Sequence, residues 1–369
     1  MFMNTLLLSF SLLTLACFSV NDTASQSRFD NWSTDQNPLS VEGKERIDAF
    51  LKDSGSSSAL ILYEGQIAYQ YGDIHRKHLI HSIRKAILGI LYGQLIQDGR
   101  IALDERVGDL ALAEAETPFS DLEASASVKQ LLESRSGIYL PAAAESAAMK
   151  ESRPARGSHE PGEAHYYNNW SFNALGTLFE ERSSKTIYEA FQDQMAEPLG
   201  MTSFKGKIGN LVLRENAEEL DILPSSLSDV DGFYFHEPQK SRHKAYHFRL
   251  SAHDLALFGQ LLLQDGMWEG RQLISKDWID QATTCRSVVN EDIGGGMSLC
   301  YGMMWSVAVR DGNVISFSHT GYGSHLISVH PGADMVIVHR APTENPDFQR
   351  KNHPSQLIGL TFQAFYSGD

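Results

Sequence analysis

Apolar residues recur along the first part of the chain with two different periods. Val41–Asp53 has helical spacing, whereas Ala59–Tyr63 and Gln66–Tyr71 are short apolar runs on either side of a turn, the pattern of a β-hairpin. From Ser82, apolar residues return every three or four positions until Asp98, which predicts a strongly amphipathic helix.

The middle of the chain reads as mainly helical, and its end reads as strands. Residues 140–165 are rich in Pro, Gly, Ser and His and predict a long loop. After Tyr301, strand-like runs are separated by Asp-Gly, Gly and Pro-Gly turns. Helical spacing predicts further helices at Ser125–Leu132, Phe172–Phe179, Ser251–Leu263 and Ser355–Phe365.

The order of these elements predicts an α+β fold of the α/β-sandwich kind. Strands from both ends of the chain are expected to join in one antiparallel sheet flanked by helices, with the middle forming a largely helical second lobe. We assign the sheet lobe to residues of about 41–105 and 260–365 and the helical lobe to about 106–259. A site is expected in the cleft between the lobes.

The N-terminus differs from the rest of the chain. Leu6–Val20 is a mostly apolar run of signal-peptide length, and a polar stretch follows it. We predict a signal peptide over residues 1–20, a disordered linker over 21–40, and export to the periplasm or the cell exterior. Cys17 stands where a lipoprotein signal carries its lipid, which would be the only contact with a membrane. Because no Lys or Arg precedes the run, a buried N-terminal helix is the alternative.

The charge balance is acidic, with 31 Lys+Arg against 46 Asp+Glu. Such a surface repels phosphate backbones and argues against nucleic acid as a partner. Without Cys17, the mature chain keeps Cys285 and Cys300, which form either a disulfide or two buried thiols. Three histidines recur at residues 75, 78 and 81, but this spacing drifts off one helical face and no carboxylate joins them, so no metal site is expected.

The first candidate chemistry is the segment Ser82-Ile83-Arg84-Lys85. Residues three apart on a helix lie on one face, so the Ser82 hydroxyl and the Lys85 amine can meet. A serine becomes a nucleophile when a base takes its proton, and a lysine serves as that base only if burial or a nearby cation lowers its pKa. We expect Arg84 to face solvent. The alternative role of Ser82 is a helix N-cap, and a second match at residues 241–244 lies in a polar stretch.

Two further segments carry groups suited to the same chemistry. In HYYNNW at 165–170, either Tyr166 with Asn168 or Tyr167 with Asn169 can face one cleft. A tyrosine relays a proton when an ammonium group stabilises its phenolate. The alternative is an aromatic plug over the core.

The other segment is His319-Thr320-Gly321, which lies between strand-like runs and precedes Tyr322. An edge strand at this place lets a substrate lie alongside it, and a backbone N–H just after it can donate to an oxyanion. The alternative is a strand that ends in a turn.

SxxK, YxN and HTG in this order resemble the penicillin-recognising serine hydrolases, and among them the branch of class C β-lactamases, DD-peptidases and esterases. LLESRSGI at 131–138 is similar to the family's LLxHTSGL, and EPLGM at 197–201 and YGMMW at 301–305 also fit. The apolar residues after the tyrosine select Tyr167 and Asn169 as the register. The resemblance covers residues of about 41–365.

The resemblance implies a role for each motif residue. Ser82 would be the nucleophile that forms an acyl-enzyme, and Lys85 and Tyr167 would move the protons, with the choice of base left open. Asn169 would orient Lys85 and the substrate, and backbone N–H groups of Ser82 and Tyr322 would form the oxyanion hole. No cofactor or metal is implied. The substrate-binding residues would be Asn169, His319, Thr320, Gly321 and Tyr322.

One departure from the family pattern changes the expected substrate. His319 stands where the third motif usually carries lysine, and histidine is largely neutral at pH 7. This favours a small ester or amide without a buried carboxylate over the alternative, a β-lactamase or DD-peptidase substrate. A non-turnover penicillin-binding or sensor protein is the alternative of another class. Arg153, Arg156 and His159 of the long loop are expected to be solvated.

Overall fold

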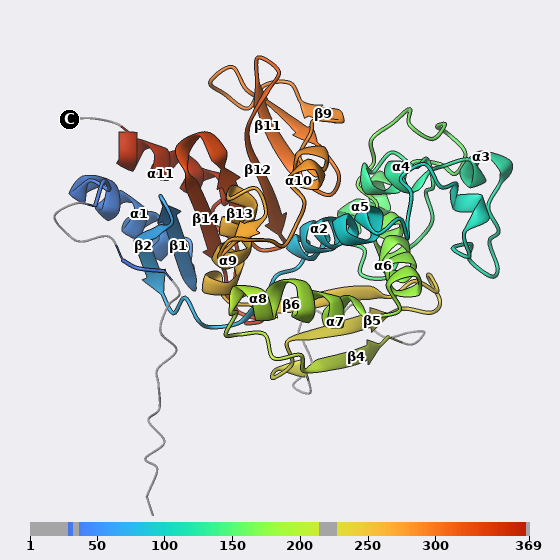
Figure 1. Ribbon diagram of the computed structural model, residues 1–369, viewed down its shortest axis with the longest axis horizontal. Helices are drawn as coiled ribbons and strands as arrows, with labels where there is room; N and C mark the ends of the chain where they lie inside the picture. The colour runs from blue at the N-terminus through green and yellow to red at the C-terminus, as the bar shows by residue number, and fades with distance from the viewer. Residues whose placement is uncertain (1–28, 32–36, 214–226, 367–369) are drawn as a thin grey trace, which may run out of the picture.

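The computed structural model describes residues 29–31, 37–213 and 227–366, and Figure 1 shows how its elements are arranged. The helices are α1 (Val41–Asp53), α2 (Ile83–Gln97), α3 (Asp121–Ala124), α4 (Val128–Leu132), α5 (Ala147–Ser152), α6 (Asn169–Ser183), α7 (Ile187–Phe191), α8 (Glu197–Leu199), α9 (Ala252–Leu263), α10 (Lys276–Ala282) and α11 (Ser355–Tyr366). The strands are β1 (Ser58–Tyr63), β2 (Gln66–Gly72), β3 (His78–Leu79), β4 (Ile208–Val212), β5 (Gly232–His236), β6 (Ala245–Leu250), β7 (Met267–Trp268), β8 (Arg271–Gln272), β9 (Ser287–Asn290), β10 (Ser298–Tyr301), β11 (Ser306–Arg310), β12 (Asn313–Gly321), β13 (His325–His330) and β14 (Met335–Arg340).

The larger sheet has eight strands in the order β2-β1-β14-β13-β12-β11-β10-β9. Every neighbouring pair is antiparallel. Strands from both ends of the chain meet near one edge of this sheet, where Leu60 of β1 lies opposite Val338 of β14. The predicted fold class, an antiparallel sheet flanked by helices, is confirmed.

Each face of this sheet packs against different helices, because side chains alternate between the two faces of a strand. Ala59 and Ile61 of β1 belong to the apolar cluster that includes α1 and α11. Leu60 and Leu62 face the other way, into the main core that includes α2 and α9. Figure 1 shows the paired α1 and α11 beside the sheet, with α9 behind it. The layers are therefore helix, sheet and helix.

The helix that follows Ser82, α2, is buried on nearly every side. All residues from Ile83 to Gly93 are buried, so the prediction of a strongly amphipathic helix is wrong. Its glycines let neighbours approach closely: a Cβ at Gly93 would lie 2.4 Å from the Trp278 ring, and the Trp278 indole donates to the Gly89 carbonyl at 3.0 Å. A helix surrounded in this way can hold polar side chains away from water.

A second sheet lies in the middle part of the chain and was not predicted. Its order is β3-β6-β5-β4, with β4 parallel to β5. It accompanies the predicted helices of that region, which appear as α4 and the longer α6, while α5 interrupts the predicted loop over 140–165. The strand β3 leads directly into the turn before α2 and so helps to place Ser82.

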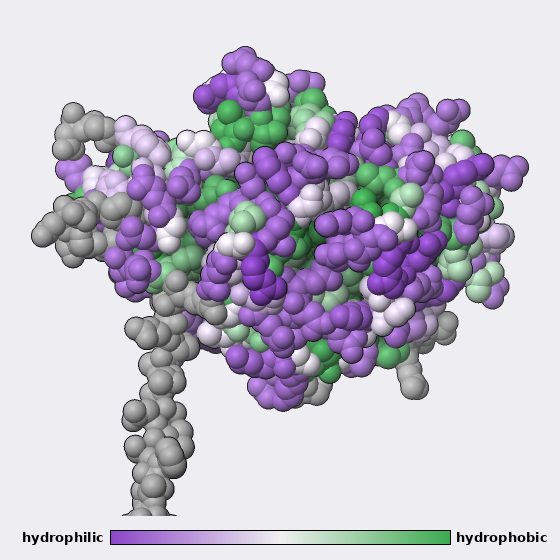
Figure 2. Space-filling model, in the orientation of Figure 1, coloured by the Kyte–Doolittle hydropathy of each residue, from purple (hydrophilic) through white to green (hydrophobic). Residues whose placement is uncertain are grey.

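A disulfide joins Cys285 and Cys300, whose Cα atoms are 5.2 Å apart. Of the two alternatives for this pair, the structure thus has the disulfide. It ties the segment before β9 to β10 at one edge of the large sheet. Figure 2 shows a mostly hydrophilic face, with apolar residues gathered below the hydrophilic tip of the projection formed by β11 and β12. Exposed apolar side chains of β9 and β12 are Val288, Val289 and Val314.

The predicted signal peptide, Cys17 and most of the predicted linker lie outside the described residues. In the described part, Phe29 is buried, Asn31 forms a β-bridge with Ile67 of β2, and the Asn37 amide donates to the Ala68 carbonyl at 2.8 Å. These contacts lie along the edge strand β2. Within the described ranges, no helix has the length and apolar character needed to cross a membrane.

Candidate active site

Ser82 lies at the turn between β3 and α2. His81 before it has a φ of +48°, a left-handed conformation that turns the chain into the helix. Ser82 occupies the N-cap position of α2, but its side chain makes no capping hydrogen bond. The hydroxyl is therefore not used as a helix cap, the alternative role considered for this serine.

Lys85 brings two other groups of the predicted site together. Its Nζ lies 3.0 Å from the Ser82 Oγ and 2.5 Å from the Tyr167 hydroxyl. The ammonium position is also 4.2 Å from the centre of the Tyr167 ring and 4.8 Å from that of Phe172. Two segments distant in sequence, one with Ser82 and Lys85 and the other with Tyr167, thus bring a hydroxyl, an amine and a phenol together.

Burial determines the charge of the Lys85 and Tyr167 side chains. Desolvation, followed by the positive charge of Arg84, lowers the pKa of Lys85 well below its ordinary value. Burial likewise raises the pKa of Tyr167. Both shifts favour uncharged forms, a neutral amine and a neutral phenol.

Arg84 does not face solvent, so the prediction for this residue is wrong. Its side chain is 1% exposed, because α2 is covered on all sides. One guanidinium nitrogen donates to the Asn173 amide oxygen at 3.1 Å, and the guanidinium lies 4.4 Å from the centre of the Tyr246 ring.

The structure separates the two tyrosine–asparagine pairs. Tyr166 donates to the Met149 carbonyl at 2.7 Å, and Asn168 caps α6 by accepting from the backbone N–H of Trp170 at 3.0 Å. Tyr167 is the tyrosine in contact with Lys85. In the pair of Tyr167 and Asn169, the tyrosine phenol therefore lies in the site. The other pair stabilises the local fold.

Asn169 makes a different contact from the expected one. Its amide nitrogen donates to the Ala144 carbonyl at 2.5 Å. Its amide oxygen accepts no hydrogen bond from any described residue, so the structure does not pair it with Lys85. This buried oxygen is an acceptor that stays available to a bound molecule.

His319 of β12 lies beside the catalytic candidates. Its ring centre is 6.5 Å from that of Tyr167. Since a carbonyl only accepts, the contact of 2.9 Å from Nδ1 to the Thr320 carbonyl places the proton on Nδ1. Burial, and next the charge of Lys85, lowers the pKa of His319 to about 3. Histidine here is neutral, with Nε2 as an acceptor.

The end of β12 packs against the turn that carries Ser82. A Cβ at Gly321 would lie 2.5 Å from the Ile80 carbonyl oxygen, so only glycine permits this approach. Tyr322 is exposed, and its ring centre lies 5.7 Å from that of His81. The Thr320 side chain is also exposed, whereas His319 and Gly321 are buried.

Two residues near Tyr167 were not predicted. The ring centre of Tyr301 lies 6.0 Å from that of Tyr167 and 4.9 Å from that of His165. Burial lowers the pKa of His165 to about 4 and raises that of Tyr301. Their signal in the sequence was only their membership of the HYYN and YGMMW segments.

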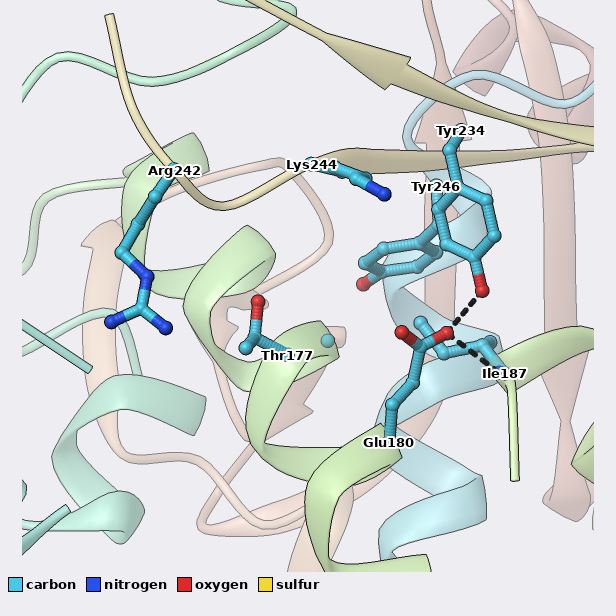
Figure 3. A pocket seen from close by; sticks show the side chains of 8 residues that line it. Thr177, Glu180, Ile187, Tyr234, Arg242, Lys244 and Tyr246 are labelled. Carbon is cyan, nitrogen blue, oxygen red and sulfur yellow. Dashed lines mark hydrogen bonds between the residues drawn. The ribbon is translucent and has the colours of Figure 1, made fainter. Parts of the chain in front are cut away.

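The second SxxK match forms no comparable pair. Ser241 donates to the Glu114 carboxylate, and Lys244 extends over the Tyr234 ring at 5.5 Å. Lys244 borders a cavity of about 190 Å³, which Figure 3 shows together with Thr177 and Tyr246.

The other charged candidates also have partners away from Ser82. Arg153 pairs with Glu145 and Arg156 with Glu123, so these loop arginines are held in ion pairs rather than freely solvated. The three histidines diverge: the ring of residue 75 lies against His253, residue 78 faces Glu344, and residue 81 contacts Thr343.

A family model described as Beta-lactamase matches residues 55–358. The chain belongs to the beta-lactamase family. Among curated proteins, Protein flp of Staphylococcus aureus (strain MW2) is 24% identical over 197 residues. This match covers 45% of the present chain and 39% of Protein flp, so the chain spans about two fifths of the length of that relative.

Solved structures of the beta-lactamase fold cover most of the chain. A candidate 6-aminohexanoate-dimer hydrolase from Bacillus anthracis is similar with a TM-score of 0.63 and 18% identity, over 91% of this chain and 86% of that one. A family VIII carboxylesterase has a TM-score of 0.57 and 16% identity, over 88% and 97% of the two chains. Further neighbours are penicillin-binding protein homologues and β-lactamases. The family and these neighbours are mostly hydrolases.

Proposed function

We propose that this protein is a serine hydrolase that forms an acyl-enzyme on Ser82. The observation that carries the proposal is the position of Lys85 Nζ, 3.0 Å from the Ser82 Oγ and 2.5 Å from the Tyr167 hydroxyl. These distances permit direct proton transfer between the three side chains.

In the acylation step, the Ser82 oxygen bonds to the substrate carbonyl carbon while its proton passes to the Lys85 amine. The direction of both pKa shifts favours Lys85 as the base, because its amine rests neutral and the Tyr167 phenolate is disfavoured. Tyr167 then gives its proton to the leaving alcohol or amine and regains one from Lys85. Water attacks the resulting ester, and the acid leaves as Ser82 recovers its proton.

The charge that develops on the carbonyl oxygen needs donors close to Ser82. The backbone N–H groups of Ser82 and Tyr322 suit this role, since Gly321 brings the end of β12 against the Ile80 carbonyl. Donors fixed by the backbone stabilise an oxyanion without rearranging during the reaction.

The substrate that suits this site is a small ester or amide. His319 is neutral where a lysine would carry a permanent charge, so a substrate carboxylate would meet no compensating cation at that position. The Asn169 amide oxygen and the His319 Nε2 both accept, which suits the N–H or O–H of a neutral substrate. The names of the structural neighbours, a candidate hydrolase of a linear amide and a carboxylesterase, agree with this class.

Rates on a panel of substrates test the proposal. We expect turnover of p-nitrophenyl esters or of 6-aminohexanoate oligomers to exceed that of a chromogenic cephalosporin. Ser82→Ala should abolish turnover, whereas Ser241→Ala, in the second SxxK match, serves as the control and should leave it. Hydrolysis that persists in Ser82→Ala would overturn the proposal.

Two alternatives give other outcomes in the same assay. Preferred hydrolysis of the cephalosporin would identify a β-lactamase, and release of D-alanine from a peptide would identify a DD-peptidase. A stoichiometric burst without turnover would identify a penicillin-binding or sensor protein.

We also propose that the protein is exported. The Cys285–Cys300 disulfide supports this, because such bonds persist mainly in oxidising compartments. Fractionation of cells that express the full chain tests it, with recovery in the cytoplasm as the contrary result.

A further inference from the structure

Two basic residues are adjacent to each other in the interior of the protein. Arg84 and Lys85 are consecutive on α2, and each is 1% exposed. No ion pair between described residues includes either of them, since their polar contacts are an amide oxygen, a hydroxyl and a phenol. In an interior that excludes water, two like charges on consecutive residues destabilise the folded state when no carboxylate pairs with them.

The groups that face Lys85 from other elements are uncharged. They are the phenol of Tyr167 before α6, the imidazole of His319 on β12 and that of His247 on β6. Burial lowers the pKa of His247 well below its ordinary value, as it does for His319. Among the described residues, Arg84 is therefore the one permanently charged group that lowers the pKa of Lys85.

The groups that face Arg84 are also uncharged. Asn173 accepts from the guanidinium and donates its own amide to the Ala143 carbonyl at 3.0 Å, which fixes its orientation. The Tyr246 ring offers its π face at 4.4 Å, a favourable position for a cation. Arg84 is thus held by an amide dipole and an aromatic ring.

The Glu180 carboxylate lines the same cavity as Tyr246, but it has other partners. Tyr246 borders the cavity of Figure 3, and so does Glu180. Figure 3 shows that Glu180 accepts from the Tyr234 hydroxyl and from the backbone N–H of Ile187. Among the described residues, the charge of Arg84 therefore has no counter-ion.

We propose that Arg84 is a positioning residue whose uncompensated charge holds the Lys85 amine in its neutral form, ready to accept the Ser82 proton. An arginine keeps its charge inside proteins, whereas a lysine can lose its proton. The electrostatic repulsion between the two side chains is therefore removed when the Lys85 amine becomes neutral. The inference rests on the proposed function, because it assigns Lys85 the part of base in that reaction.

The pH dependence of Ser82 labelling by a fluorophosphonate tests this inference. In the wild type, the labelling rate should be flat from neutral pH upward. In Arg84→Met and Arg84→Gln, the acid limb of the pH–rate profile should move up by about one to two pH units. This slows labelling by about 10- to 100-fold at pH values below the wild-type limb and restores it at higher pH.

Each contrary outcome has a distinct meaning. An unmoved acid limb of the pH–rate profile in the folded neutral variants, or a rate loss that is equal at every pH, would overturn the inference but leave Ser82 as the nucleophile. Absence of any label on wild-type Ser82 would instead overturn the proposed function.

A second measurement covers the case in which the neutral variants do not fold. The Lys85 Cε signal of ¹³C-lysine-labelled wild-type protein, assigned by its loss in Lys85→Arg, reports the charge of the amine directly. We expect the signal of a neutral amine at pH 7, and the signal of an ammonium group there would overturn the inference.

Discussion

The backbone of Gly321 lies against the carbonyl oxygen of Ile80, so the end of β12 meets the turn that carries Ser82. A Cβ at Gly321 would be 2.5 Å from that oxygen and 3.0 Å from the His325 Cβ, and neither neighbour is a flexible chain end. This contact fixes the distance between the nucleophile and the strand that we expect to bind substrate.

We therefore expect Gly321→Ala to slow acylation by about 100-fold, because a displacement of about 1 Å at a reacting centre has an effect of that size. The measurement is the rate of Ser82 labelling, together with the melting temperature. Gly332→Ala is the matched control, since a Cβ at Gly332 meets nothing within 4 Å. Equal rates for the two variants would show that the contact does not position the site.

Tyr167→Phe should lower kcat by about 10²- to 10⁴-fold, because it removes the phenol while keeping the ring that packs against Phe172. Tyr166→Phe is the control, since the Tyr166 hydroxyl donates to the Met149 carbonyl and not to a residue of the site. Steady-state rates on a 6-aminohexanoate oligomer, whose leaving amine must be protonated, would decide. A larger loss in Tyr166→Phe would show that the other register carries the proton.

The folding stability should fall as the pH drops from about 6.5 toward 4. Burial lowers the pKa of His319 to about 3, and those of His330 and His339 to about 4, below the unfolded value of 6.5. Between these values the unfolded chain binds more protons, so acid favours unfolding, by up to about 1.4 kcal/mol per pH unit for each residue.

Urea denaturation at pH 7 and pH 5 measures this effect. His330→Gln should show a smaller loss between the two values than the wild type, because one buried titrating group is absent. A free energy of unfolding that is the same at both pH values would contradict the account of these histidines.

Loss of the Cys285–Cys300 disulfide should lower the free energy of unfolding by roughly 3 kcal/mol, the size expected for a loop of this length. Reductant should lower the melting temperature of the wild type but not that of the double variant Cys285→Ala/Cys300→Ala. If complete reduction leaves the wild-type melting temperature unchanged, the bond does not stabilise the fold.

Local sequence patterns were enough to predict those helices and strands whose formation depends mainly on their own residues. The helix α1 has the predicted bounds. The helix α9 begins directly after Ser251, the first residue of the predicted range, and the Ser251 hydroxyl caps it by accepting from the Asp254 N–H. The strands at both ends of the chain have strong apolar runs, and their pairing in one sheet followed from these runs.

Features that depend on distant neighbours could not be predicted in this way. Arg84 reads as an exposed helix position, and only the packing of α6, α10 and β6 around α2 shows that it is buried. The small sheet escaped prediction because β4 and β5 are only partly buried and have no clear alternation. The contact of Tyr301 with Tyr167 joins segments more than a hundred residues apart.

Peptide mapping by mass spectrometry after fluorophosphonate treatment tests the central claim most directly, because it identifies the nucleophile without knowledge of the substrate. We predict a single adduct, on Ser82, which disappears in Ser82→Ala and is strongly reduced in Lys85→Met. An adduct on Ser241 or another residue, or full labelling in Ser82→Ala, would contradict the account.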